Sequence, residues 1–434
     1  MFVCGFYKKK IEKLLIYLAP CKDILVKVKK RKDKKMIIKK NMYFVFITVL
    51  FIIILSITSC FPLASKEELE KIIQRDSVAF DLESIPEEVL DQLASHKVVL
   101  VGENHFLEEH YAFMGELLRE LHSRGFRQIL VEWTQIGDWL MDDFVNDGGL
   151  EPEWEPANNF FGGIIARAVR DFNRTVPDSE HIQIHGIDIT LLDYGGGESF
   201  IASLGMLTNH LPDSGPLSEL LTSEYDKPDN QTALLEDLKD KLNLNRSELI
   251  ESWGEQWYNM VAEMIEVELM SIPIRAIRER NYDKSVRMRE DAMKQIADRR
   301  LESYSYRTLI NVGSTHAQKT RLWGTKIEWL GDYLVHKSQV IGGSVIVLWV
   351  TPAYIVSAPG SEIPDYDLST SPENELLSLM SQTWPDQVIF LPTDDPMFSN
   401  RKIPINSESE IYLVPPKRYF DIYVLLPIAH RISR

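Results

Sequence analysis

The sequence is short of cysteine. Its 434 residues include only three cysteines, Cys4, Cys21 and Cys60. No cysteine follows Cys60, so the body of the chain can form neither an internal disulfide nor a cysteine-based zinc site. A body without cysteine is compatible with an oxidising compartment.

The body also has little positive charge. Residues 60–434 hold 34 Lys and Arg against 61 Asp and Glu, whereas residues 1–59 hold 14 against 3. The body has no basic stripe, which argues against a nucleic-acid partner. With 44% hydrophobic and 26% charged residues, the composition is that of a globular protein and excludes collagen, coiled coil and general disorder. The length allows two to three domains, or one large α/β domain with insertions.

The N-terminal segment has the pattern of a secretion signal. Residues 22–40 are rich in Lys and Arg, and residues 42–58 form a nearly unbroken apolar run. The run ends in Ile57-Thr58-Ser59-Cys60, which resembles a bacterial lipobox, whose cysteine is lipidated and becomes the mature N-terminus. We therefore expect a protein of the bacterial cell envelope, held at the membrane by lipidated Cys60, because several acyl chains anchor firmly. The alternative is an uncleaved transmembrane helix, for which this run is at the short limit.

Beyond this segment, short apolar runs alternate with helical patterns. This alternation predicts an α/β fold with a largely parallel central sheet flanked by helices and a helical insertion. We expect strands at 97–102, 128–132, 182–187, 308–312, 344–350 and 420–426. We expect helices at 106–123, from the second strand to about 145, and at 325–336, with long helices over 215–300 interrupted once, at Pro273. The predicted units are a signal or leader over 1–59, a lipid-anchored tether with a first helix over 60–95, and an α/β domain over 96–434 with the insertion at about 200–275.

Acidic and imidazole side chains stand at the ends of four predicted strands. In open parallel sheets, ligands bind at the carboxyl ends of the strands. Glu103 and His105 follow the first strand, Glu132 ends the second, Asp188 follows the third and His316 follows the fourth. We expect these groups to meet in one cleft.

Two histidines with two or three carboxylates support two kinds of chemistry. Glu103, His105, Glu132 and His316 can hold a divalent metal whose bound water attacks the substrate. Alternatively, a carboxylate can orient a histidine that acts directly on water as a general base. Structural roles are the competing interpretation: a helix cap for His105, a buried ion pair for Glu132, a turn brace for Asp188 and a bond to a backbone carbonyl for His316. The other histidines of the helices and loops, such as His110, are interpreted as structural or solvated.

A series of short motifs then points to a family. The motifs are Val101-Gly102-Glu103-Asn104-His105, Gly125 to Glu132, Asp143-Phe144-Val145 with Gly148-Gly149, Ile184 to Asp188, Arg289-Glu290-Asp291-Ala292-Met293, Val312 to His316 and Tyr419-Phe420-Asp421. In this order they resemble the erythromycin esterase-like proteins, within a superfamily that includes the ChaN haem-binding lipoproteins and the Tiki (GumN) proteases. The resemblance covers roughly residues 90–430.

The resemblance implies roles for individual residues. It makes His105 the general base, Glu103 and Glu132 its carboxylate partners, His316 a further site residue and Arg289 a clamp for an anion or transition state. Three features depart from the esterases. The first Glu and His are two apart, as in the ChaN branch; glycine takes the first of the two late histidine positions; and no arginine closely follows the first histidine.

The hypothesis favoured by these features is a lipid-anchored hydrolase that activates water against an ester or acyl bond of an unidentified small molecule. A haem- or iron-binding lipoprotein of the ChaN kind is the second hypothesis, because of the short Glu-x-His spacing and the lipobox. A metal-dependent protease of the Tiki kind is the third, and an inactive scaffold is the fourth. The cofactor is accordingly none, a divalent metal or haem.

Overall fold

The computed structural model describes residues 63–147, 161–191, 196–221, 225, 230–321, 327–359, 361, 364–367, 375–407 and 410–432. The predicted leader, Cys60 and the Gly148-Gly149 pair lie outside these residues. Within them, no helix combines the length and apolar character needed to cross a membrane.

A nine-stranded sheet forms the centre of the molecule, with the order β1-β8-β11-β6-β2-β5-β3-β4 and with β7 paired to β6. The strands are β1 (Val78–Phe80), β2 (Val98–Glu103), β3 (Phe126–Thr134), β4 (Gln183–Asp188), β5 (Arg307–Gly313), β6 (Val345–Val356), β7 (Tyr366–Asp367), β8 (Val388–Pro392) and β11 (Ile422–His430). The six predicted strands run parallel from β4 to β11, whereas β1, β7 and β8 pair antiparallel. The predicted α/β fold with a largely parallel sheet is therefore confirmed. A separate hairpin consists of β9 (Ile403–Ser407) and β10 (Glu410–Val414).

Both faces of the sheet are buried. Along β2, Val98 and Leu100 pack into one core, and Val99 and Val101 pack into the other. Successive residues of a strand point to opposite faces, so a strand covered on both sides reads as an unbroken apolar run. This explains why the parallel strands are recognisable in the sequence.

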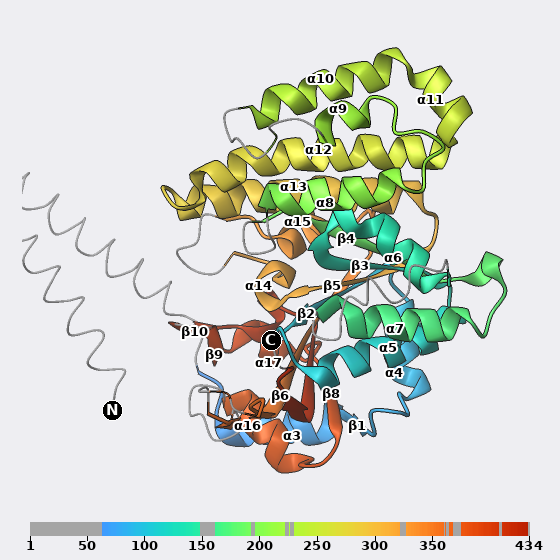
Figure 1. Ribbon diagram of the computed structural model, residues 1–434. Helices are drawn as coiled ribbons and strands as arrows, with labels where there is room; N and C mark the ends of the chain where they lie inside the picture. Colours follow the sequence, from blue (N-terminus) through green and yellow to red (C-terminus); the bar gives the residue numbers. More distant parts are fainter. Residues whose placement is uncertain are drawn as a thin grey trace, which may run out of the picture. The chain divides into compact units, whose positions relative to one another are not determined.

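Helices cover the two faces, as Figure 1 shows. One core includes residues of α4 (Glu87–Ala94), α5 (Glu108–His122), α6 (Asp138–Val145) and α7 (Phe161–Asn173). The other includes residues of α3 (Lys66–Asp76), α13 (Tyr282–Ser303), α14 (Ser314–Ala317), α15 (Leu330–His336), α16 (Glu375–Thr383) and α17 (Pro396–Asn400). Short 3-10 turns occur at Gln135–Gly137, Asp178–Glu180 and Pro416–Arg418.

The segment between β4 and β5 is helical. Before α13 it contains α8 (Gly196–Thr208), α9 (Leu217–Leu221), α10 (Gln231–Leu244), α11 (Arg246–Trp253) and α12 (Glu255–Arg278). The prediction of a single interruption at Pro273 is wrong, because Pro273 lies inside α12. The chain breaks instead at places such as Gly254, whose φ of +86° favours glycine. The helix predicted from 325 begins only at Leu330.

Candidate active site

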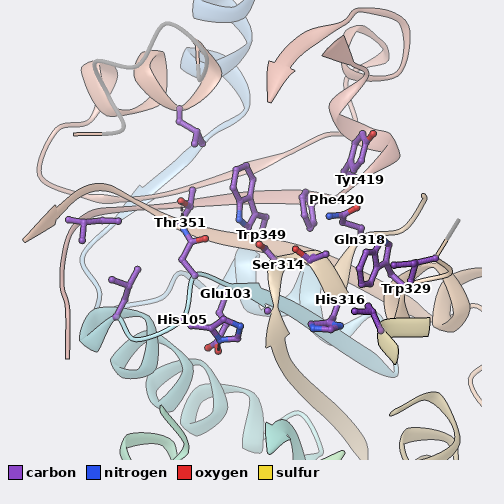
Figure 2. Close-up of a pocket in the computed structure, with 18 of the residues that line it drawn as sticks. Glu103, His105, Ser314, His316, Gln318, Trp329, Trp349, Thr351, Tyr419 and Phe420 are labelled. Carbon is purple, nitrogen blue, oxygen red and sulfur yellow. Dashed lines mark hydrogen bonds and ion pairs between the residues drawn. The ribbon is translucent and has the colours of Figure 1, made fainter. Parts of the chain in front are cut away.

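The carboxyl ends of the parallel strands bring the predicted site residues together. Glu103 ends β2 beside Gly313, the last residue of β5. Asp188 ends β4 opposite Thr134 of β3. The ends of β2 and β5 border a cavity of about 780 Å³. Its lining includes Glu103, His105, Arg289 and His316. Figure 2 shows Glu103, His105 and His316 along one side of the pocket and Trp349 and Thr351 on the other.

Glu103 and His105 form a dyad. The Nδ1 of His105 donates a hydrogen bond of 2.6 Å to Oε1 of Glu103. The second oxygen, Oε2, accepts a bond of 2.7 Å from Nδ2 of Asn311 and lies 3.2 Å from Nε2 of His110. Glu103 is buried, whereas the His105 side chain is 38% exposed. Nε2 of His105 lies 3.9 Å from Oε2 of Glu132 and beside Gly313, which lines the cavity.

A strained turn follows His105. Phe106 has a φ of +66°, a left-handed conformation that is unusual for a bulky residue and costs of order 1–3 kcal/mol. Its backbone N–H donates to the hydroxyl of Tyr111, and its carbonyl accepts from the N–H of Ile432. Contacts from α5 and from the end of β11 thus hold the turn that directs His105.

Glu132 lies at the centre of the cluster, behind the cavity wall. Its Oε1 accepts bonds from Nη2 of Arg289 at 2.5 Å and from Nε2 of His316 at 3.2 Å. Its Oε2 accepts a bond of 2.7 Å from the backbone N–H of Gly313 and lies 3.9 Å from Nε2 of His105. Glu132 therefore joins the early and the late histidine.

Arg289 connects α13 to two strand ends. Its Nε and Nη2 donate to the carboxylate of Asp188, at 2.9 Å and 2.5 Å, and Nη2 also reaches Glu132. Asp188 is thus an ion-pair partner as well as a local cap for the backbone N–H of Ile189. The guanidinium neutralises charge inside the cluster.

His316 is held between two carboxylates. Its Nδ1 donates to Oε1 of Glu290 and its Nε2 faces Glu132. The other oxygen of Glu290 accepts from the backbone N–H of Leu330. Burial alone lowers the pKa of His316, but the charges of Glu132 and Glu290 outweigh it and raise that pKa to about 10. His316 is therefore a buried imidazolium at neutral pH.

The pKa values of Glu103, Glu132 and His105 are also shifted. Burial alone raises the pKa of Glu103, but hydrogen bonds from His105 and His110 lower it to about 2. Burial also opposes the charged form of Glu132, yet the charges of His316 and Arg289 hold its pKa well below the usual value. Burial lowers the pKa of His105, but the bond to Glu103 outweighs this effect and leaves the pKa raised.

The cluster does not fit a divalent metal. Among the residues that the structure describes, no group of three or more His, Cys, Asp and Glu side chains is placed to hold a metal ion. Arg289 also places a fixed cation inside the cluster, with its Nη1 3.5 Å from Nε2 of His316.

Three residues of the cluster were not among the predicted site residues. Asn311 and His110 hold Glu103, and Glu290 holds His316. An asparagine within the apolar run Leu309 to Val312 of β5 is a signal that a buried polar partner is present. No comparable signal marks His110 and Glu290, because their partners come from distant elements.

Comparisons with known proteins give the fold. A scan against models of protein families and a search of curated proteins found no match. Solved structures that match include a protein from Bacillus cereus (13% identity, TM-score 0.64, 86% of this chain and 100% of that one). The erythromycin esterase EreC also matches, with 17% identity and a TM-score of 0.59 over 80% of this chain and 94% of that one. A succinoglycan biosynthesis protein matches with 14% identity and a TM-score of 0.62 over 85% of this chain and 99% of that one. The chain thus has the erythromycin esterase fold.

Proposed function

We propose that this protein is a hydrolase that uses His105 as a general base on water against an ester or related acyl bond. The observation that carries the proposal is the Glu103–His105 pair. One imidazole nitrogen is fixed by a buried carboxylate, and the ring faces a large cavity. This arrangement selects the tautomer in which Nε2 can accept a proton, as in other carboxylate–histidine pairs.

The reaction follows from these positions. Nε2 of His105 takes a proton from water as the water oxygen attacks the carbonyl carbon. The negative charge that develops on the carbonyl oxygen is stabilised by the fixed cations Arg289 and His316, which also line the cavity. When the tetrahedral intermediate collapses, His105 returns the proton to the leaving alcohol oxygen. The products are a carboxylic acid and an alcohol.

The wall of the cavity favours a substrate with an apolar or ring-shaped part. Trp349 stacks on Phe420 with ring centroids 5.5 Å apart, and Trp329 lies edge-on to His316 at 5.6 Å. Tyr419 completes this aromatic wall, which Figure 2 shows around Gln318. Aromatic side chains supply large apolar contact areas, so esters with aryl or extended acyl groups are the first substrates to test.

The test compares hydrolysis of a panel of aryl and alkyl esters by the full-length protein and by His105→Ala. We expect the variant to lose turnover by roughly 10²–10⁴-fold while its circular dichroism spectrum is unchanged. His336→Ala is the control, because His336 is exposed and lies on α15. Full activity in His105→Ala would contradict the proposal.

The lipid anchor at Cys60, and with it a location in the cell envelope, is part of the same proposal. It is supported by the lipobox-like sequence Ile57-Thr58-Ser59-Cys60 after an apolar run. Labelling of expressing cells with a fatty-acid analogue should mark the protein, and Cys60→Ser should abolish the label. Label retained in Cys60→Ser would rule out this anchor.

A further inference from the structure

Arg431 lines the cavity of the candidate active site from the end of β11. It forms an isolated antiparallel bridge with Leu107, and its backbone N–H donates to the carbonyl of Val356. Residues directly opposite in such a pair have Cα atoms about 4.5–5.5 Å apart. Leu107 is two residues after His105, so the backbone of Arg431 lies next to the segment that carries the proposed general base, and both side chains line the same cavity.

The backbone around Arg431 is fixed on both sides. The N–H of His430 donates to Oε2 of Glu109 at 2.6 Å, and the N–H of Ile432 donates to the carbonyl of Phe106 at 3.0 Å. Leu107 and Ile355, which also line the cavity, are buried against one another and against Ala429. These hydrogen bonds fix the backbone on either side of Arg431, and the cavity wall next to it is largely apolar.

Over the described part of the chain, no carboxylate forms an ion pair with Arg431. Its Nε is buried and has no hydrogen-bond partner. Arg289, the other arginine of the cavity, is engaged with Asp188 and Glu132. A buried donor without a partner costs about 1–3 kcal/mol, and more when it is charged. The body has 61 acidic residues, yet none of those that the structure describes forms an ion pair with Arg431. Its guanidinium can therefore bind an incoming anion.

We propose that Arg431 is a subsite for a carboxylate group of the substrate. The inference deepens the proposed function: the substrate would be an ester with a second, free carboxylate next to the scissile bond. Arginine binds a carboxylate through two parallel N–H bonds. Since the nearby cluster contains Glu103, Glu132, Asp188 and Glu290, a singly charged carboxylate is repelled less than a doubly charged phosphate monoester.

Binding measurements test the subsite without requiring turnover. Phenylacetate, its neutral amide phenylacetamide and phenyl phosphate are titrated into the full-length protein, with calorimetry and indole fluorescence as readouts. Trp329 and Trp349 line the cavity and serve as reporters. We expect phenylacetate to bind roughly 10–100-fold more tightly than the amide, the range for a charge-assisted hydrogen bond. Arg431→Gln should abolish this preference, and Arg431→Lys should retain part of it.

The matched control is Arg246→Gln. Arg246 lies on α11, is exposed and packs over the ring of Tyr258, so this variant removes the same charge away from the cavity and should keep the wild-type preference. Equal binding of acid and amide to the wild type would overturn the proposal. A preference retained in folded Arg431→Gln, or tighter binding of phenyl phosphate than of phenylacetate, would also overturn it.

Turnover gives a second readout. The ratio of kcat/KM for the acidic ester p-nitrophenyl hydrogen glutarate to that for neutral p-nitrophenyl butyrate should fall roughly 10–100-fold in Arg431→Gln. A ratio that does not change would contradict the subsite. If no ester is hydrolysed by the wild type, the proposed function fails, but the titrations still decide whether Arg431 binds a carboxylate.

Discussion

Glu103 determines both the orientation and the pKa of His105. Its hydrogen bond raises the pKa of His105 and fixes the neutral tautomer that carries its proton on Nδ1. Because a general base must be neutral, we expect kcat/KM to rise with pH through a pKa above the ordinary histidine value of about 6.5.

Glu103→Gln tests this coupling. Without the carboxylate, the pKa of His105 falls, so the acid limb of the pH–rate profile should move to lower pH. Turnover should also fall by roughly 10²–10⁴-fold because the ring is no longer oriented. Glu116→Gln on α5, which removes only a pair with Arg119, is the control. An acid limb that stays in place would contradict the coupling.

Gly313 keeps the space that His105 occupies. A Cβ at position 313 would lie 2.7 Å from Nε2 of His105 and 3.3 Å from Oε2 of Glu132. We expect Gly313→Ala to displace His105, reducing turnover by at least about tenfold while destabilising the fold by about 1–3 kcal/mol. Gly205→Ala on α8, where a Cβ would make only ordinary contacts, should leave activity unchanged. Normal kinetics in Gly313→Ala would show that His105 tolerates displacement.

At the scale of elements, Arg289 joins α13 to the strands β3 and β4, and Glu290 joins it to the helices α14 and α15. Arg289→Gln would leave the buried carboxylates of Glu132 and Asp188 without their shared cation. We expect a loss of about 3–5 kcal/mol in the free energy of unfolding at pH 7, because breaking a buried pair strands a charge. Urea denaturation of the wild type and the variant at pH 7 measures this loss, and equal free energies of unfolding would contradict the explanation.

The parallel strands were predictable from the sequence, whereas the short antiparallel strands β1 and β7 were not. Strands such as β2 and β5 are buried on both faces, so their apolar runs are visible in the sequence. The strands β1 and β7 are too short for a pattern, with three and two residues. Pro273 was misread because an exposed proline can remain within a long helix that is packed elsewhere. The proximity of Glu103, Glu132 and His316 was predictable because the carboxyl ends of parallel strands meet at one edge of the sheet. The contacts of His110 and Glu290 depend on how helices pack, which the sequence pattern does not show.

At the scale of the whole molecule, the buried cluster limits the pH range of stability. The pKa of His316 is raised from 6.5 to about 10. The contribution of His316 to the free energy of unfolding is therefore fully present below pH 6.5 and is lost as the pH rises towards 10. This contribution is on the order of 5 kcal/mol. The lowered pKa of Glu103 acts in the opposite direction: its contribution is present above pH 4.5 and is lost as the pH falls towards 2.

Thermal unfolding between pH 6 and pH 10 measures this dependence. We expect the wild-type Tm to fall across the range and the fall to be smaller in His316→Gln, which cannot titrate. The variant should be less stable than the wild type at pH 6 and close to it at pH 10. Parallel curves for the two proteins would show that another group controls the alkaline loss.

The bond between Ile432 and Phe106 has a consequence for how the protein is made. The ribosome completes residues 103–106 early, but the partner that holds the turn after His105 is added more than three hundred residues later. A nascent or prematurely terminated chain would carry every acidic and imidazole group of the cluster and still lack the clamp that directs the reactive nitrogen. The water activation that we propose would then begin only after synthesis has passed β11.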